Sequence, residues 1–189
     1  MAATVLYMSM SLDGFIAGPN ERLDNPLGDG GGRLHDWSFT DEMDINGQVF
    51  KEFMATGAIV AGSGTFEPAG GWGGDHHDGV PIWVLSRHEP RIDISQWPLV
   101  TYTNDLNRAI ADAKLAAGDK NVLLHGAATA QLALADGLLD ELELHIIPVL
   151  IGHGRRLFEN LASDHVELER TRILEGENGV THMHYRVQR

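Results

Sequence analysis

The chain of 189 residues contains no cysteine. It therefore cannot form disulfides, use a thiolate in catalysis or build a cysteine-based zinc site. No apolar run approaches the roughly 18 residues needed to cross a bilayer. The first residues enter an apolar segment without a basic region, which is untypical of a signal peptide. We therefore expect a cytoplasmic protein that does not enter the membrane.

Positive charge is also scarce. Lys and Arg number 14 against 27 Asp and Glu, which gives a formal net charge of -13. Nucleic acids and anionic membranes repel such a chain, so neither is an expected partner. A hydrophobic fraction of 43% with 22% charged residues is typical of a globular protein. The length and the absence of repeats or linkers favour one domain over residues 1–189.

Predicted strands alternate with predicted helices along most of the chain. Helices are expected after a cap at Thr40 or Asp41, from Asn104 or Asp105 to Gly118, and directly after Gly126. Strands are expected at residues 4–10, 15–17, 57–62, 80–86, 99–103, 122–125, up to Pro148, 166–174 and 180–187. This order predicts a three-layer α/β fold whose mainly parallel sheet ends in an antiparallel C-terminal hairpin.

Small or hydroxyl-bearing residues follow three of the predicted strands, at 62–65, 86–87 and 126–129. In open α/β sheets ligands bind at the carboxyl ends of strands, so these segments are expected to line one cleft. Backbone N–H groups at a helix start suit phosphate oxygens, and Arg87 offers a charge-assisted contact. Small residues at helix starts also serve close packing alone. The chain has neither a G-x-G-x-x-G after a strand nor a P-loop lysine.

Four segments carry a family resemblance when they are taken in order: SLDGFIA at 11–17, GSGTFE at 62–67, VLSR at 84–87 and the run from 121 to 158 that ends in PVLIGHGRRLF. Together they resemble the reductase domain of bifunctional riboflavin-biosynthesis deaminase-reductases and its stand-alone relatives, a branch of the dihydrofolate reductase fold. The resemblance covers about residues 4–187. It implies NADPH as cofactor, hydride transfer to a pterin-like or aminopyrimidine-type heterocycle, and a homodimer built on the C-terminal hairpin.

The resemblance also implies a cofactor cleft. The residues placed near the nicotinamide are Ser9, Asp13, Ile16 and Ala17. The residues placed around the phosphates and the adenosine are Gly62, Ser63, Thr65, Phe66, Ser86, Arg87, Gly126, Ala127, Ala128, Thr129 and Gln131. Ser63 stands where the family has a basic residue, which leaves Arg87 to contact the 2′-phosphate that distinguishes NADPH from NADH. Ala127 stands where many relatives have glycine, so the turn there is expected to differ slightly.

Substrate binding and protonation are assigned to the segment that follows. His35 and Trp37 are expected to hold a flat heterocycle by hydrogen bonding and stacking, although Trp37 also suits the edge of a core. Folate reductases carry an acid on the first long helix, which corresponds here to Asp41, Glu42 and Asp44. We assign the proton donor to Asp44, while acids in a first helical turn also complement the helix dipole.

Histidine pairs suggest an alternative. His182 and His184 share one face of a predicted strand, a spacing that can hold a metal, and residues 75–78 read Asp-His-His-Asp. A metal-dependent hydrolase is therefore a second hypothesis, and a silent nucleotide- or pterin-binding relative is a third. Without further ligands at a recognisable spacing, surface histidines are favoured and no metal is expected.

Overall fold

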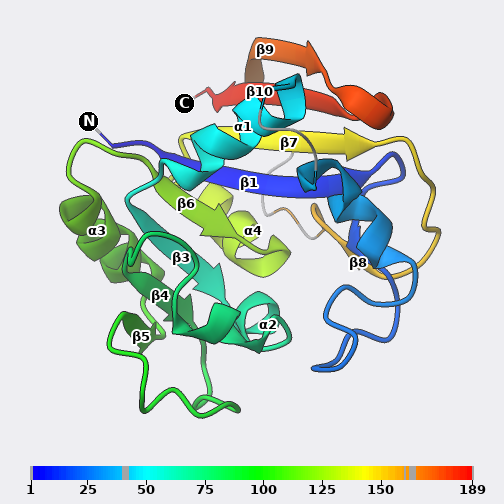
Figure 1. The fold of residues 1–189 in the computed structure, drawn as a ribbon. Helices are drawn as coiled ribbons and strands as arrows, with labels where there is room; N and C mark the ends of the chain where they lie inside the picture. Colours follow the sequence, from blue (N-terminus) through cyan, green and yellow to red (C-terminus); the bar gives the residue numbers. More distant parts are fainter. Residues whose placement is uncertain (1, 40–42, 160, 162–164, 189) are drawn as a thin grey trace.

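An eight-stranded sheet forms the middle layer of the fold (Figure 1). The structure is a computed structural model that describes residues 2–39, 43–159, 161 and 165–188. The strands lie in the order β5-β4-β3-β6-β1-β7-β10-β9. Their bounds are β1 (Thr4–Ser11), β3 (Ala58–Gly62), β4 (Ile82–Leu85), β5 (Val100–Thr103), β6 (Val122–His125), β7 (Glu141–Ile147), β9 (Leu168–Glu175) and β10 (Thr181–Val187).

The predicted mainly parallel sheet is confirmed. All neighbours from β5 to β7 pair in parallel, whereas β10 runs antiparallel to both β7 and β9. The short 3-10 helix η3 (Glu177–Gly179) joins β9 to β10, so these strands form the expected C-terminal hairpin. A separate antiparallel pair is formed by β2 (Phe15–Ala17) and β8 (Arg155–Arg156). This pair brings the N-terminal motif next to the GHGRR segment.

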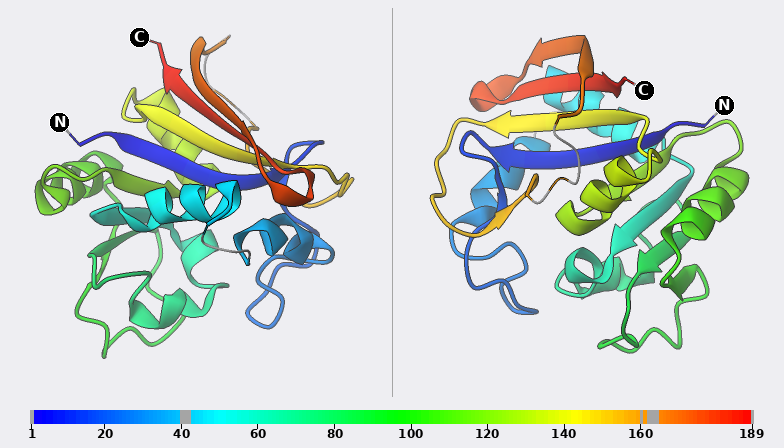
Figure 2. Two further views of the ribbon diagram at one scale, coloured as in Figure 1. Left: turned by 45° about the horizontal axis from the view of Figure 1, so that its top comes forward. Right: turned by 180° about the vertical axis from the view of Figure 1, so that it is seen from behind.

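Helices cover both faces of the sheet (Figure 2). One face carries η1 (Gly31–Ser38), α1 (Ile45–Met54) and α2 (Ser63–Phe66), and the other carries α3 (Leu106–Ala117) and α4 (Ala127–Ala135). A further short 3-10 segment, η2 (Gly70–Gly74), follows α2. Across the described ranges, no helix is long and apolar enough to cross a membrane.

Side chains of β1 point alternately into the two hydrophobic cores, one on each face of the sheet. Leu6 and Met8 pack on the face of α3 and α4, whereas Tyr7 packs on the face of α1 and η1. This alternation follows from the two-residue period of a strand. Because β1 is central and covered on both faces, its side chains are mostly buried regardless of which face they meet.

The caps of the helices partly follow the sequence. Asp105 caps α3 by accepting from the Arg108 N–H at 3.0 Å, and Gly118, with φ 62°, ends that helix as predicted. The residues predicted to cap α1, Thr40 and Asp41, lie outside the described residues. The N-cap of α1 is Asp44, whose Oδ1 accepts from the Gly47 N–H at 2.7 Å. The helix therefore begins later than its earliest predicted cap.

The expectation of surface histidines is wrong for His77, which is 5% exposed, and for His182, which is fully buried. His182 is held by two hydrogen bonds. Its Nδ1 lies 2.7 Å from Nδ1 of His145, and its Nε2 lies 2.9 Å from Oδ1 of Asn46. Because the amide oxygen only accepts, His182 Nε2 carries the proton and His145 Nδ1 donates to His182 Nδ1. Strand β9 pairs beyond β10, and α1 and Trp37 pack over it, so β10 lies inside the sheet and not at its edge. This chain of hydrogen bonds ties α1 to the C-terminal hairpin.

We expect Asn46→Ala to lower the free energy of unfolding by about 1–3 kcal/mol, because it leaves the buried N–H of His182 without an acceptor. Urea denaturation at pH 7 measures the change. Asn104→Ala alters an exposed asparagine and should change the free energy of unfolding by less than about 0.5 kcal/mol. Coincident curves for Asn46→Ala and wild type would contradict this assignment.

Candidate active site

Two neighbouring strand ends define the candidate site. Strands β3 and β6 pair in parallel, but the helices that follow them pack on opposite faces of the sheet, α2 on one and α4 on the other. The chain therefore separates at the carboxyl ends of these strands. In open α/β sheets such a switch point is where ligands bind. Of the three segments expected to line one cleft, residues 62–65 and 126–129 meet at this point.

The two strand-to-helix junctions touch each other through glycines. A Cβ on Gly126 would lie 2.5 Å from Oγ1 of Thr65, and a Cβ on Gly62 would lie 2.8 Å from Oγ1 of Thr129. Gly126 has φ 97° and ψ 147°, a region open essentially only to glycine. Ala127 is not among the residues with positive φ, so alanine fits there as the first residue of α4.

The start of α4 is open to a ligand. No side chain caps this helix, so its first backbone N–H groups lack an intrahelical acceptor. The hydroxyl of Thr129 beside them is buried without a hydrogen-bond partner among the described atoms. Predicted phosphate-binding residues from two distant segments are thus brought together around unused donors, which suits a phosphate group.

A cavity of about 470 Å³ opens beside these junctions. Six of the predicted site residues line it: Ser9, Ile16, Ala17, His35, Trp37 and Thr65. Trp72 lines it as well. Trp37 is only 3% exposed and donates from Nε1 to Oγ of Ser9 at 2.8 Å. It therefore both lines the cavity and packs into the core, as the two sequence interpretations separately proposed.

Six of the other lining side chains are aromatic or imidazole groups: Tyr7, Phe39, Phe50, Phe53, His76 and His125. Burial lowers the pKa of His35, and it lowers the pKa of His76 to about 4, with a smaller effect from neighbouring His77. Burial, followed by the nearby histidines, also holds the pKa of His125 well below its ordinary value. The three imidazoles are therefore neutral at pH 7, and the cavity offers flat, uncharged walls with hydrogen-bonding edges.

The wall of this cavity contains one ion pair. Arg155 forms an ion pair with Glu21 at 2.8 Å and donates from Nη1 to the carbonyl of Gly64 at 3.0 Å. Among the described residues that line the cavity, these two are the charged ones. Sequence patterns alone predict neither Arg155 nor His125 as a site residue. Arg155 belongs to the GHGRRLF motif, but only the pairing of β2 with β8 shows where it lies.

Other predicted residues lie away from the cavity wall. Phe66 is fully buried against Trp72, Trp97 and Tyr102, so its ring belongs to the core. Gln131 donates from Nε2 to the carbonyl of Leu157 at 2.9 Å. These two side chains therefore support the walls and do not line the cavity.

Asp13 and the strand end at 86–87 also lie outside the lining. Asp13 accepts from the Ser11 hydroxyl at 2.6 Å, which with two backbone N–H groups lowers the pKa of its carboxyl to about 2. Ser86 donates to the carbonyl of His88 at 2.8 Å, and Arg87 is exposed beside it. Ser63 is the first residue of α2, and Ala128 is the second residue of α4.

Asp44, the predicted proton donor, has a structural role. Asp44 caps α1 and is not among the residues lining the cavity, while Asp41 and Glu42 lie outside the described residues. Its catalytic role stays a prediction. In the part of the chain that the structure describes, no three His, Asp or Glu side chains converge as metal ligands.

The fold and the cleft define an open α/β domain with a candidate ligand site at its switch point. The chain belongs to the RibD C-terminal domain family, whose model matches residues 3–182. No curated protein matches the sequence.

Solved structures share the fold. One is a candidate riboflavin biosynthesis protein from Shewanella sp. PV-4, with 23% identity, a TM-score of 0.73 and coverage of 99% of both chains. A pyrimidine reductase-like protein from Corynebacterium diphtheriae has 17% identity and a TM-score of 0.62, with coverage of 100% of this chain and 92% of that one. RibD from Acinetobacter baumannii has 15% identity and a TM-score of 0.59, and the match covers all of this chain but 59% of that one.

Gly126→Ala is expected to lower the free energy of unfolding by about 3 kcal/mol, the upper part of the range for such backbone strain, because the methyl group also meets Thr65. Gly137→Ala provides the control: its φ is 66°, but nothing lies within 4 Å of the added Cβ. It should cost about 1–2 kcal/mol. Thermal and urea denaturation measure both. Equal losses would show that the contact between the two junctions is unimportant.

The ring protons of His76 should show no titration between pH 8 and pH 5.5, because protonation would place a charge among buried imidazoles. Proton NMR, with His76→Asn for assignment, measures this. Since the unfolded side chain still ionises near pH 6.5, the stability of the protein should fall as the pH drops from 6.5 towards 4. A His76 midpoint near 6.5 would contradict the burial of this side chain.

Proposed function

We propose that this domain is a reductase that transfers hydride from NADPH to a flat, conjugated heterocycle of the pterin-like or aminopyrimidine type. The observation that carries the proposal is the open start of α4, with its buried Thr129 hydroxyl, directly beside a cavity with flat neutral walls. Membership of the RibD C-terminal domain family and the name of the pyrimidine reductase-like neighbour support the same reaction class.

The residues fit a dinucleotide in two places. Gly62 and Gly126 allow the starts of α2 and α4 to approach each other closely, and the first N–H groups of α4 are suited to the pyrophosphate. Ser9 and Ile16 would contact the nicotinamide, while Ser86 and Arg87 would contact the 2′-phosphate. When bound, the cofactor supplies the hydride.

The chain itself orients the acceptor and excludes water. Trp37, held by its hydrogen bond to Ser9, offers an aromatic face for stacking beside the neutral His35. Neutral imidazoles donate through one nitrogen and accept through the other, so they can match the edge of a heterocycle without a charged partner. Asp44 remains the proposed proton donor. Its carboxylate would have to exchange the Gly47 N–H for the substrate or reach it through water.

Titration with NADPH and NADH, followed by nicotinamide fluorescence, tests the proposal. We expect saturable binding of NADPH, and Arg87→Ala should weaken it about tenfold while leaving NADH affinity unchanged, because a charge-assisted contact contributes about 1.5–3 kcal/mol. Arg108→Ala removes an exposed cation on α3 and should leave both affinities unchanged.

The outcomes separate the assignments. Failure of both dinucleotides to bind below millimolar concentration would refute the reductase proposal. Loss of the preference for NADPH in Arg155→Ala but not in Arg87→Ala would move the 2′-phosphate contact to Arg155. If NADPH binds but no dihydropterin or aminopyrimidine is turned over, the result would favour the hypothesis of a catalytically silent binding protein.

A further inference from the structure

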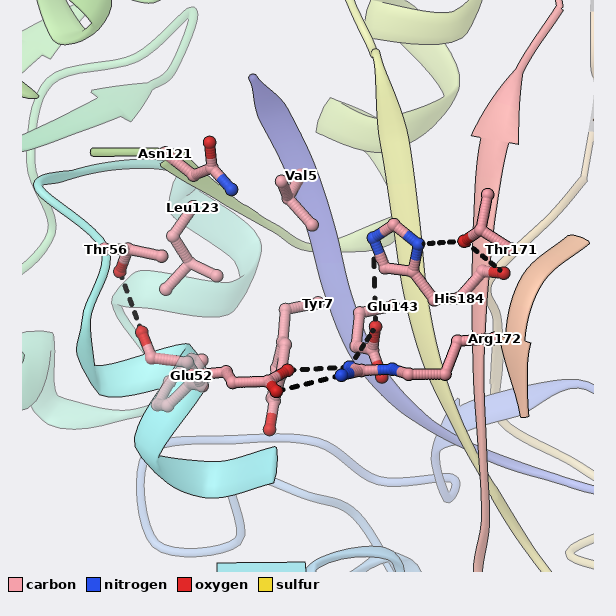
Figure 3. A pocket seen from close by; sticks show the side chains of 11 residues that line it. Val5, Tyr7, Glu52, Thr56, Asn121, Leu123, Glu143, Thr171, Arg172 and His184 are labelled. Atoms are coloured by element: carbon pink, nitrogen blue, oxygen red, sulfur yellow. Dashed lines mark hydrogen bonds and ion pairs between the residues drawn. The ribbon is translucent and has the colours of Figure 1, made fainter. Parts of the chain in front are cut away.

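A second cavity, of about 300 Å³, lies on the face of the sheet that carries α1 (Figure 3). Residues from α1 and from strands β1, β6, β7, β9 and β10 line it. Tyr7 and Phe53, whose ring centroids are 4.4 Å apart, line both this cavity and the candidate active site. These two rings therefore form a shared wall. The second cavity is otherwise separate from the cofactor cleft.

One side of the second cavity is charged. Figure 3 shows Arg172 of β9 and Glu52 of α1 reaching towards each other across it. Arg172 donates from both terminal nitrogens to Glu52, at 2.8 and 2.6 Å. This two-point contact pairs the guanidinium charge with Glu52. Arg172 has only a longer contact, of 3.3 Å, with Glu143.

Glu143 is left with an unused oxygen. The residue is 4% exposed, and its Oε1 is buried without a hydrogen-bond partner among the described atoms. Burial raises the pKa of its carboxyl to about 7, against the lowering effect of Arg172. His184 lies 3.9 Å from Oε2 but does not supply a cation, because burial lowers its own pKa. A buried carboxylate without a full partner is costly, and a ligand that donates to it would remove this cost.

Apolar side chains form part of the remaining wall, together with the polar side chains of Thr56, Asn121, Thr171 and His184. Val5 and Leu123 lie to one side of the charged groups in Figure 3, and the rings of Tyr7 and Phe53 line the cavity as well. A ligand here therefore meets a carboxylate with one unused oxygen and the apolar rings of Tyr7 and Phe53. Glu52 and Glu141 face the same carboxylate, so an anionic ligand would be repelled.

We propose that this second cavity binds a small organic cation, an amine or amidinium group carried on a flat apolar body. The cation donates a hydrogen bond to Oε1 of Glu143 and balances its charge, while the apolar body packs against Tyr7 and Phe53. The site is independent of the proposed reductase activity, because Glu143 lies outside the candidate active site.

Benzamidine is the probe, since it joins an amidinium to a flat ring. Benzamide, of nearly the same shape but neutral, and benzoate, which is anionic, are the comparison ligands. Calorimetric titration at pH 8 should show saturable binding of benzamidine, at least tenfold weaker binding of benzamide, and no binding of benzoate. Glu143→Gln keeps the shape and removes the charge, so it should weaken benzamidine binding at least tenfold. Glu175→Gln, an exposed change on the same strand as Arg172, should not.

A nitrogen-15 NMR titration of the wild-type protein locates the site without relying on a variant. Benzamidine should shift the backbone signals of Glu143, Tyr7 and Arg172 and leave those of Thr65 and Gly126 unchanged. NADPH affinity should be the same in Glu143→Gln as in wild type, which separates this test from that of the reductase. Equal binding of benzamidine and benzamide, shifts centred on Gly126, or the absence of saturable binding would overturn the proposal.

Discussion

The site depends on the close contact between two strand-to-helix junctions. Gly126 approaches the hydroxyl of Thr65, and Gly62 approaches the hydroxyl of Thr129, so closely that neither glycine can carry a Cβ without displacing its neighbour. This contact lets β3 and β6 lie side by side while their helices leave on opposite faces. It also places the uncapped start of α4 against the start of α2. The switch point and the open N–H groups therefore have one steric cause.

The chemistry of the main cavity follows from burial more than from charge. Imidazoles that would be partly protonated in water are held neutral because desolvation and their neighbours disfavour the cation. The ion pair of Arg155 with Glu21 adds no net charge. A cavity of this kind selects for planarity and for the placement of donors and acceptors. The charged parts of a ligand are better served by the strand ends around Gly126, where backbone N–H groups are available.

Much of the fold was predictable because it rests on local signals. Continuous apolar runs such as residues 122–125, the cap at Asp105 and the stop at Gly118 each carry their own physical cause. The positions of several side chains were not predictable, because they depend on pairings between distant segments. His182 is buried only because β9 extends the sheet, and Arg155 reaches the cavity only because β8 pairs with β2. Phe66 belongs to the GSGTFE motif that predicts a cofactor contact, but its ring packs into the aromatic core.

The same face of the sheet holds two cavities of opposite character, and the wall between them is thin. Tyr7 and Phe53 present one side to neutral imidazoles and the other to the carboxylates of Glu52 and Glu143. Burial together with these carboxylates raises the pKa of Tyr7, so its ring remains an uncharged partition. An occupant of either cavity must pack against the same pair of rings. The position of Phe53 on α1, which Asn46 anchors to the hairpin, then fixes both cavities at once. The buried hydrogen-bond chain of α1 thus influences the shape of the main cavity from a distance.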